Sequence, residues 1–195
     1  MAALIILALT VITSLAGLWF APRLIEWNLF RPYWFLRSRQ YWTAIGSALV
    51  HASLSHLLLN AMTFWFFARP LERVIGSIRL TALYAFGLAV SDAGTWIRYR
   101  NDPNYASLGA SGAILAVLFA AIVYFPRQSI FILPIPVPIP APLFAVCYLL
   151  FSFYSTRHPH GRINHAAHFD GALAGLAFVA LTDPEAWQRA VAAFR

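Results

Sequence analysis

The amino-acid sequence predicts an all-α membrane protein, a bundle of six transmembrane helices in a single domain over residues 1–195. Of the 195 residues, 61% are hydrophobic and only 11% are charged, whereas a soluble domain has about 25% charged residues. A soluble chain of this length cannot bury so much apolar surface, and disorder would require low hydrophobicity. The apolar residues also gather in blocks approaching the length of about 20 residues that a helix needs to cross a bilayer.

The charge pattern argues against nucleic-acid binding, and the cysteine count excludes two kinds of cysteine site. The formal net charge is +7, and all basic residues are Arg. These Arg residues are scattered between the apolar blocks and form no basic stripe, so we expect no nucleic acid as a partner. Cys147 is the single cysteine, which rules out an internal disulfide and a zinc site built from cysteines.

The first predicted span, residues 1–20, contains no charged side chain. It could instead be a signal peptide, but it lacks a positively charged start and no clear cleavage site follows it. The five later spans are predicted, from the apolar blocks, at 54–68, 78–93, 108–125, 140–156 and 166–182.

Two connections between the spans are distinctive. Residues 21–50 are rich in aromatic side chains, which suit the membrane–water interface, and a connection this long is usually functional. The connection before the fifth span carries prolines at alternate positions, which cannot be helical. We expect an extended entry to that span, containing Pro134, Pro136, Pro138, Pro140 and Pro142.

Polar side chains inside a span are costly and indicate function, and the first such group lies at the second span. Asn60 lies about 40° from His56 around a helix, so the two share a face. His51 lies about 220° from His56 and precedes the helix, for which Ser53 is a plausible N-cap. The alternative is that His56 and Asn60 are buried groups that tie this span to a neighbour.

The second group, Gly109-Ala110-Ser111-Gly112, opens the fourth span. Glycines around a serine let backbone groups approach a reacting centre. Gly112, Ala116 and Ala120 continue as a stripe of small residues that permits close helix contact. Taken alone, the group is more simply explained as a packing motif.

The third group opens the sixth span. Gly171 and Gly175 lie about −60° and −20° from His168, so one face carries an imidazole with glycines beneath it. The small face of the fourth span could approach there, which would bring Ser111 and His168 within hydrogen-bond distance, as nucleophilic catalysis requires. Asp170 lies about 200° away, which argues against a local Ser-His-Asp triad. We expect it to pair with an Arg or another polar group of a different span.

In chain order, these residues resemble the motifs of the rhomboid intramembrane serine proteases. The resemblance covers roughly residues 40–182, and its three motifs are His51-x4-His56-x3-Asn60, Gly109-x-Ser111-Gly112 and His168-x2-Gly171-x3-Gly175. Gly-x-Ser-Gly is a weak signal by itself, but three motifs that each lie on their own apolar span are specific.

The resemblance implies a rhomboid-like bundle that cleaves transmembrane helices with a Ser-His dyad. Ser111 would be the nucleophile and His168 the general base. The side chains of His56 and Asn60, together with the backbone N–H of Ser111, would hold the oxyanion. The remaining motif residues would have structural or packing roles near the site: His51, Gly109, Gly112, Gly171 and Gly175.

The resemblance further implies that no metal and no cofactor take part. The partners would be the lipid bilayer and membrane-anchored substrates, whose transmembrane helices must unwind locally. The protein would lie in the inner membrane of a bacterium, with the dyad open to the outer face.

The sequence departs from the family pattern at two positions. Thr43 follows Trp42 where family members often have Arg. Leu115 stands where many members carry an aromatic residue stacked on the catalytic histidine. His168 must therefore be held in another way.

Two alternative functions remain. A catalytically inactive rhomboid-like protein that binds membrane proteins should have lost the nucleophile or the base, and this chain has both candidates. A metal- or haem-binding membrane protein would use imidazole ligands, and it would leave Ser111 and Asn60 unexplained. Its ligands would be His51, His56, His165 and His168.

Overall fold

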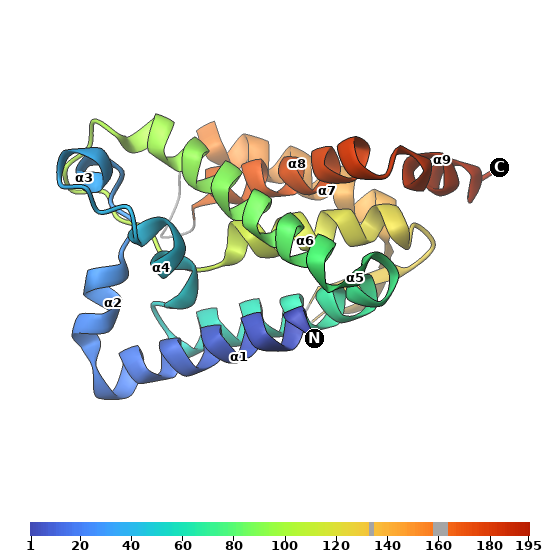
Figure 1. Ribbon diagram of the computed structural model, residues 1–195. Coiled ribbons are helices and arrows are strands. Elements are labelled where there is room, and N and C mark those ends of the chain that lie inside the picture. Colours follow the sequence, from blue (N-terminus) through green and yellow to red (C-terminus); the bar gives the residue numbers. More distant parts are fainter. Residues whose placement is uncertain (133–134, 158–163) are drawn as a thin grey trace.

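Helices make up most of the computed structural model, which describes residues 1–132, 135–157 and 164–195 (Figure 1). The long helices are α1 (Ala2–Leu15, continued by the π-helical turn η1, Ala16–Phe20), α5 (Leu54–Tyr99), α6 (Ser111–Tyr124), α7 (Ala141–Arg157) and α8 (His165–Thr182). Shorter helices are α2 (Pro22–Asn28), α3 (Pro32–Arg37), α4 (Thr43–Leu49) and α9 (Pro184–Ala192). Among the described residues, Ala2–Phe20 and Leu54–Tyr99 are long and apolar enough to cross a membrane. The predicted helical membrane fold is confirmed.

The second and third predicted spans both lie within α5. The helix is broken at Gly76, whose φ of +81° and ψ of 163° are not helical. Glycine adopts a positive φ without the steric penalty that a Cβ brings. The chain turns sharply there, so that residues 54–75 lie beside α1 and residues 77–99 run back across the bundle (Figure 1).

The start of α5 has the N-cap that the sequence predicts. The Oγ of Ser53 accepts a hydrogen bond from the backbone N–H of His56 at 3.2 Å, which satisfies one of the free donors at the helix N-terminus.

The aromatic connection 21–50 folds into the three short helices α2, α3 and α4. Its Trp42 indole donates to the carbonyl of Trp27 at 3.1 Å. The backbone of Phe30 pairs with that of Ser107 in both directions, at 2.9 and 3.0 Å. This connection therefore holds the loop that leads into α6.

The proline-rich segment is extended, as predicted. Strand β2 (Ile135–Pro140) pairs antiparallel with β1 (Ser129–Ile132), so this small hairpin is an exception to the all-helical expectation. Pro142 instead lies in the first turn of α7, where a residue needs no N–H to donate. Pro134 lies outside the described residues.

Helix α6 is the centre of the bundle, and its residues 112–123 are all buried. Helices α5 and α8 pack against it. A Cβ built on Gly175 of α8 would lie 2.8 Å from the carbonyl carbon of Ala116, and one on Gly87 of α5 would lie 3.3 Å from the Cα of Ala113. The small residues of α6 therefore let both neighbouring helices approach its backbone.

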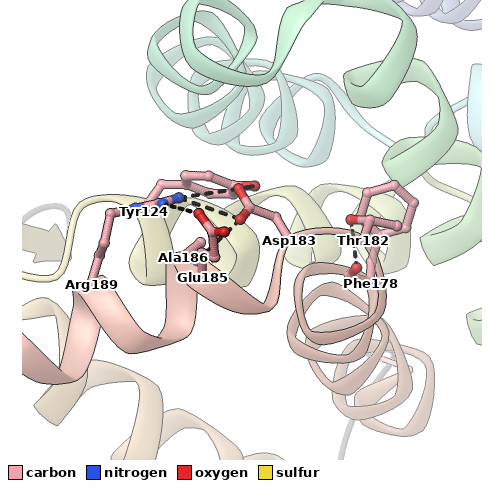
Figure 2. Close-up of polar contacts among 7 residues, drawn as sticks. All are labelled: Tyr124, Phe178, Thr182, Asp183, Glu185, Ala186 and Arg189. Atoms are coloured by element: carbon pink, nitrogen blue, oxygen red, sulfur yellow. Dashed lines mark hydrogen bonds and ion pairs between the residues drawn. The ribbon is translucent and has the colours of Figure 1, made fainter.

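A polar junction joins the ends of α6, α8 and α9. Tyr124 donates its hydroxyl hydrogen to Asp183 at 2.9 Å, and Asp183 also accepts the backbone N–H of Ala186 at 3.1 Å (Figure 2). Arg189 pairs with the same carboxylate at 3.3 Å. Asp183 is thus both the N-cap of α9 and the anchor of this end of α6.

Candidate active site

Ser111 and His168 meet where α6 and α8 begin. The Oγ of Ser111 lies 2.7 Å from Nε2 of His168. Ser111 is the first residue of α6, and His168 lies in the first turn of α8. The start of α8 is held by Asn164, which accepts the backbone N–H of Ala167 at 3.0 Å and donates to Thr95 of α5 at 3.1 Å. A serine hydroxyl that can donate to an imidazole nitrogen is the arrangement that activates a nucleophile.

The other ring nitrogen of His168 also has a partner. Its Nδ1 lies 3.2 Å from the hydroxyl oxygen of Tyr148 on α7. Tyr148 belongs to none of the motifs identified in the sequence. The signal was indirect: Leu115 offers no aromatic ring to His168, so another contact had to hold the imidazole. Helical periodicity within one span does not reveal which residue of another helix makes that contact.

Asn60 belongs to a buried chain of hydrogen bonds. The Oγ of Ser14 on α1 donates to the carbonyl of Leu49 at 2.9 Å and lies 2.9 Å from Nδ1 of His51. Nε2 of His51 lies 2.8 Å from the Nδ2 of Asn60. Because the Ser14 proton goes to Leu49, Nδ1–H of His51 donates to Ser14, and Nε2 accepts from Asn60. Ser14 belongs to none of the motifs identified in the sequence.

His51 lies closer to the other two polar residues than an angle around the helix would indicate. His51 precedes α5, so the 100° step of a helix does not describe its position. Its ring lies edge-on to that of His56, with centroids 4.8 Å apart, and it bonds to Asn60 directly. His51 is fully buried, with hydrogen-bond partners on α1 and α5.

His56 lies against the loop that leads into the serine. A Cβ built on Gly109 would lie 2.7 Å from Cε1 of His56 and 3.8 Å from Nδ2 of Asn60. Gly109 also has a φ of +107°, which glycine tolerates best. Its N–H donates to the backbone carbonyl of Ser47 at 2.8 Å. The side chains of His56 and Asn60 thus lie near the N-terminus of α6, where backbone N–H groups have no partner within the helix.

Close packing of α6 and α8 brings the serine and the histidine together. A Cβ built on Gly171 would lie 2.7 Å from the carbonyl carbon of Gly112. Both glycines are buried. Gly171 is one turn after His168, and Gly112 follows Ser111, so this contact sets the distance between the side chains of Ser111 and His168.

Asp170 pairs with an Arg of another span, as expected. Its carboxylate makes a bidentate ion pair with Arg98 of α5, with an Nη2–Oδ1 distance of 3.1 Å. A Cβ built on Gly94 would lie 2.8 Å from the carboxylate carbon of Asp170, so this glycine makes room for the pair. The other unexplained residue, His165, lies edge-on to Phe151 at 5.5 Å and 6.2 Å from the ring of His168.

His51 and His168 are poorly placed to bind a metal. Both ring nitrogens of His51 and both of His168 already have hydrogen-bond partners. In the part of the chain that the structure describes, no three His, Cys, Asp or Glu side chains are grouped as metal ligands would be.

Comparison with known proteins shows what the chain is similar to. Residues 38–184 match the family model of the Rhomboid domain. YdcA of Bacillus subtilis, which carries the name of a rhomboid protease, is 37% identical over 78 residues, or 40% of this chain and 38% of that protein. The mitochondrial rhomboid protein 1 of Saccharomyces cerevisiae is 27% identical over 83% of this chain and 48% of its own length. Rhomboid protease GlpG of Pectobacterium atrosepticum is 28% identical over 70% of this chain and 47% of its own. The matched region therefore spans less than half the length of these relatives.

Proposed function

Because the chain belongs to the rhomboid family, we propose that it is an intramembrane serine endopeptidase that cleaves the transmembrane helices of membrane-anchored proteins. The observation that carries the proposal is the 2.7 Å contact between Ser111 Oγ and His168 Nε2 at the N-terminus of α6. The names of bacterial relatives, which include rhomboid proteases, also support it.

The first half of the reaction forms an acyl-enzyme. Ser111 Oγ bonds to the carbonyl carbon of the scissile peptide while its proton moves to Nε2 of His168. When the tetrahedral intermediate collapses, the C–N bond breaks, and the leaving amine takes the proton from Nε2. In the second half, water attacks the acyl carbon and passes a proton to His168. Oγ then leaves, recovers that proton, and the product is a carboxylic acid.

Three donors would stabilise the negative oxygen of each tetrahedral intermediate. They are the backbone N–H of Ser111 and the side chains of His56 and Asn60, which lie beside the Gly109 loop. Losing one such donor typically costs about 3 kcal/mol of transition-state stabilisation. The bond from Asn60 to His51 orients the amide in advance, so little reorganisation is needed during the reaction.

The length of α6 supports access of water to this site. Its 14 residues are about 21 Å long, whereas the hydrocarbon core of a bilayer is about 30 Å thick. With its C-terminal end near one face, the N-terminus and Ser111 would lie below the opposite surface, under the connection 21–50. A substrate helix must unwind locally there, because a regular helix uses its own carbonyl groups in hydrogen bonds.

We also propose the inner membrane of a bacterium as the location, with the dyad open to the outer face. The bilayer and transmembrane-helix substrates are the partners in this proposal, with no cofactor or metal in the chemistry. Its relatives include both bacterial and mitochondrial proteins. The orientation can be tested in a bacterium that expresses the protein with a cysteine introduced near residue 104. We expect a reagent added from the outside to label this cysteine.

The function is tested by cleavage of a reporter transmembrane substrate in lipid vesicles. Wild type should cleave, and Ser111→Ala and His168→Ala should not. Ser129→Ala, on exposed β1, is the matched serine control and should cleave normally. A fluorophosphonate probe should label wild type and Ser129→Ala but not Ser111→Ala. Full cleavage by Ser111→Ala would overturn the serine mechanism, and a wild-type protein that binds substrate without cleavage or labelling would be an inactive binder.

A further inference from the structure

We propose that Tyr148 is the positioning residue of the general base, through a hydrogen bond that its phenolic oxygen accepts from Nδ1–H of His168. This inference rests on the proposed function, in which His168 Nε2 takes the proton of Ser111. It assigns a role to a residue of α7 that the sequence motifs do not contain.

The proton positions follow from the contacts of His168. A nucleophilic serine must donate its proton to Nε2, which lies 2.7 Å from Ser111 Oγ. A neutral imidazole carries one N–H, so that hydrogen must be on Nδ1. Nδ1 lies 3.2 Å from the hydroxyl oxygen of Tyr148, which therefore accepts. The contact favours the tautomer that has a free lone pair on Nε2.

Packing against two phenylalanines holds Tyr148 in position to accept the hydrogen bond from His168. Its ring lies 5.7 Å from that of Phe119 on α6 and 5.5 Å from that of Phe144 on α7, measured between centroids. Phe119 is fully buried and Phe144 is 9% exposed. The phenolic oxygen is thus placed by an aromatic cluster between two helices, and this cluster anchors the imidazole from the α7 side.

The acidic residue nearest in sequence to His168 is not free for the same task. Asp170 is engaged by Arg98 through both carboxylate oxygens. A neutral phenol also suits this apolar environment better than a carboxylate, because burying an unpaired charge is expensive. Tyr148 can therefore orient the imidazole without placing a negative charge within the bundle.

The contribution of Tyr148 should be larger in the transition state than in the resting enzyme. When His168 gains the serine proton it becomes an imidazolium, and a hydrogen bond from a charged donor is stronger than one from a neutral donor. An interaction that strengthens in this way raises kcat and leaves KM unchanged.

The test is Tyr148→Phe, which keeps the ring in the aromatic cluster and removes the acceptor. We expect kcat for the reporter substrate to fall about fivefold to tenfold, the worth of one hydrogen bond, with an unchanged KM and melting temperature. The rate of fluorophosphonate labelling of Ser111 should fall by a similar factor, because this small probe needs the same base. Tyr154→Phe is the matched control: it removes a hydroxyl from a side chain of α7 that is 63% exposed and lies about 240° further around the helix.

Nitrogen-15 NMR of histidine-labelled protein gives a readout that does not depend on activity. Wild type should show His168 protonated on Nδ1, and Tyr148→Phe should show a mixture of the two tautomers. Unchanged kcat and labelling rate in Tyr148→Phe would overturn the inference. So would a raised KM with an unchanged labelling rate, which would assign Tyr148 to substrate admission. If wild type cleaves nothing, the proposed function fails. The role of Tyr148 fails separately if wild-type His168 carries its proton on Nε2.

Discussion

Gly171 of α8 packs directly on the backbone of Gly112 in α6, with no space for a side chain between them. These glycines adjoin His168 and Ser111, one on each helix, so the width of this contact determines whether hydroxyl and imidazole can meet.

Replacing Gly171 with valine should therefore abolish cleavage. The branched side chain must push α8 away from α6, and a displacement of about 1 Å at a catalytic contact can lower the rate about a hundredfold. Membrane insertion should be unaffected, because valine is apolar. The measurements are cleavage of the reporter substrate and extraction of the protein from membranes. Undiminished turnover of Gly171→Val would show that the close packing does not set the dyad distance.

His51 and Asn60 should act as one unit in a double-mutant cycle. Asn60→Ala removes a proposed oxyanion donor, and we expect kcat to fall about a hundredfold. His51→Ala removes only the acceptor that orients Asn60, so its effect should be smaller, on the order of tenfold. Since the role of His51 passes through Asn60, the double variant should be no slower than Asn60→Ala alone. If the losses of kcat from the two substitutions multiplied in the double variant, His51 would not act through Asn60.

Asp170→Asn should leave the chemistry largely intact. Asp170 pairs with Arg98 and not with the dyad, so kcat should stay within about threefold of wild type, whereas His168→Ala should be inactive. The melting temperature should fall slightly, because a partly exposed ion pair contributes at most about 1 kcal/mol to stability. Arg98→Gln should lower it by a similar amount. A loss of activity in Asp170→Asn as complete as that in His168→Ala would assign the carboxylate to the catalytic machinery.

The α8–α9 junction should weaken in acid. The hydroxyl of Tyr124 donates to Asp183 and, with the N–H of Ala186 and with Arg189, holds the pKa of that carboxyl below its usual range. A carboxyl with a depressed pKa stabilises the fold at pH values above its unfolded pKa, which is about 3.9. This stabilisation is lost as the pH falls through that value and then through the lower pKa of the folded state.

Melting temperatures in detergent between pH 7 and pH 3 measure this effect. Wild type should lose more stability over this range than Asp183→Asn, which cannot titrate but keeps an oxygen for the cap of α9. Tyr124→Phe removes the hydrogen bond to Asp183 (Figure 2), which is the largest cause of the lowered pKa of that carboxyl. This variant should therefore lose less stability between pH 7 and pH 3 than wild type. Equal acid sensitivity of wild type and Asp183→Asn would show that this junction contributes nothing to the pH dependence.

The membrane fold and the candidate residues could be predicted from the amino-acid sequence alone. The predicted spans are almost wholly apolar, so the few polar side chains on them could each be considered individually. The N-cap at Ser53, the extended proline segment and the pairing of Asp170 with an Arg also followed from rules that act over short distances or from the cost of a buried charge.

How those residues are held depends on contacts between helices that are distant in the sequence. Tyr148 reaches His168 from a different helix, and Ser14 reaches His51 from α1. The turn before α5 brings His51 to Asn60, although helical periodicity separates His51 from His56. Periodicity specifies which residues share a face of one helix. The contacts between helices depend on how α1, α5, α6, α7 and α8 pack together, which no single segment of the sequence specifies.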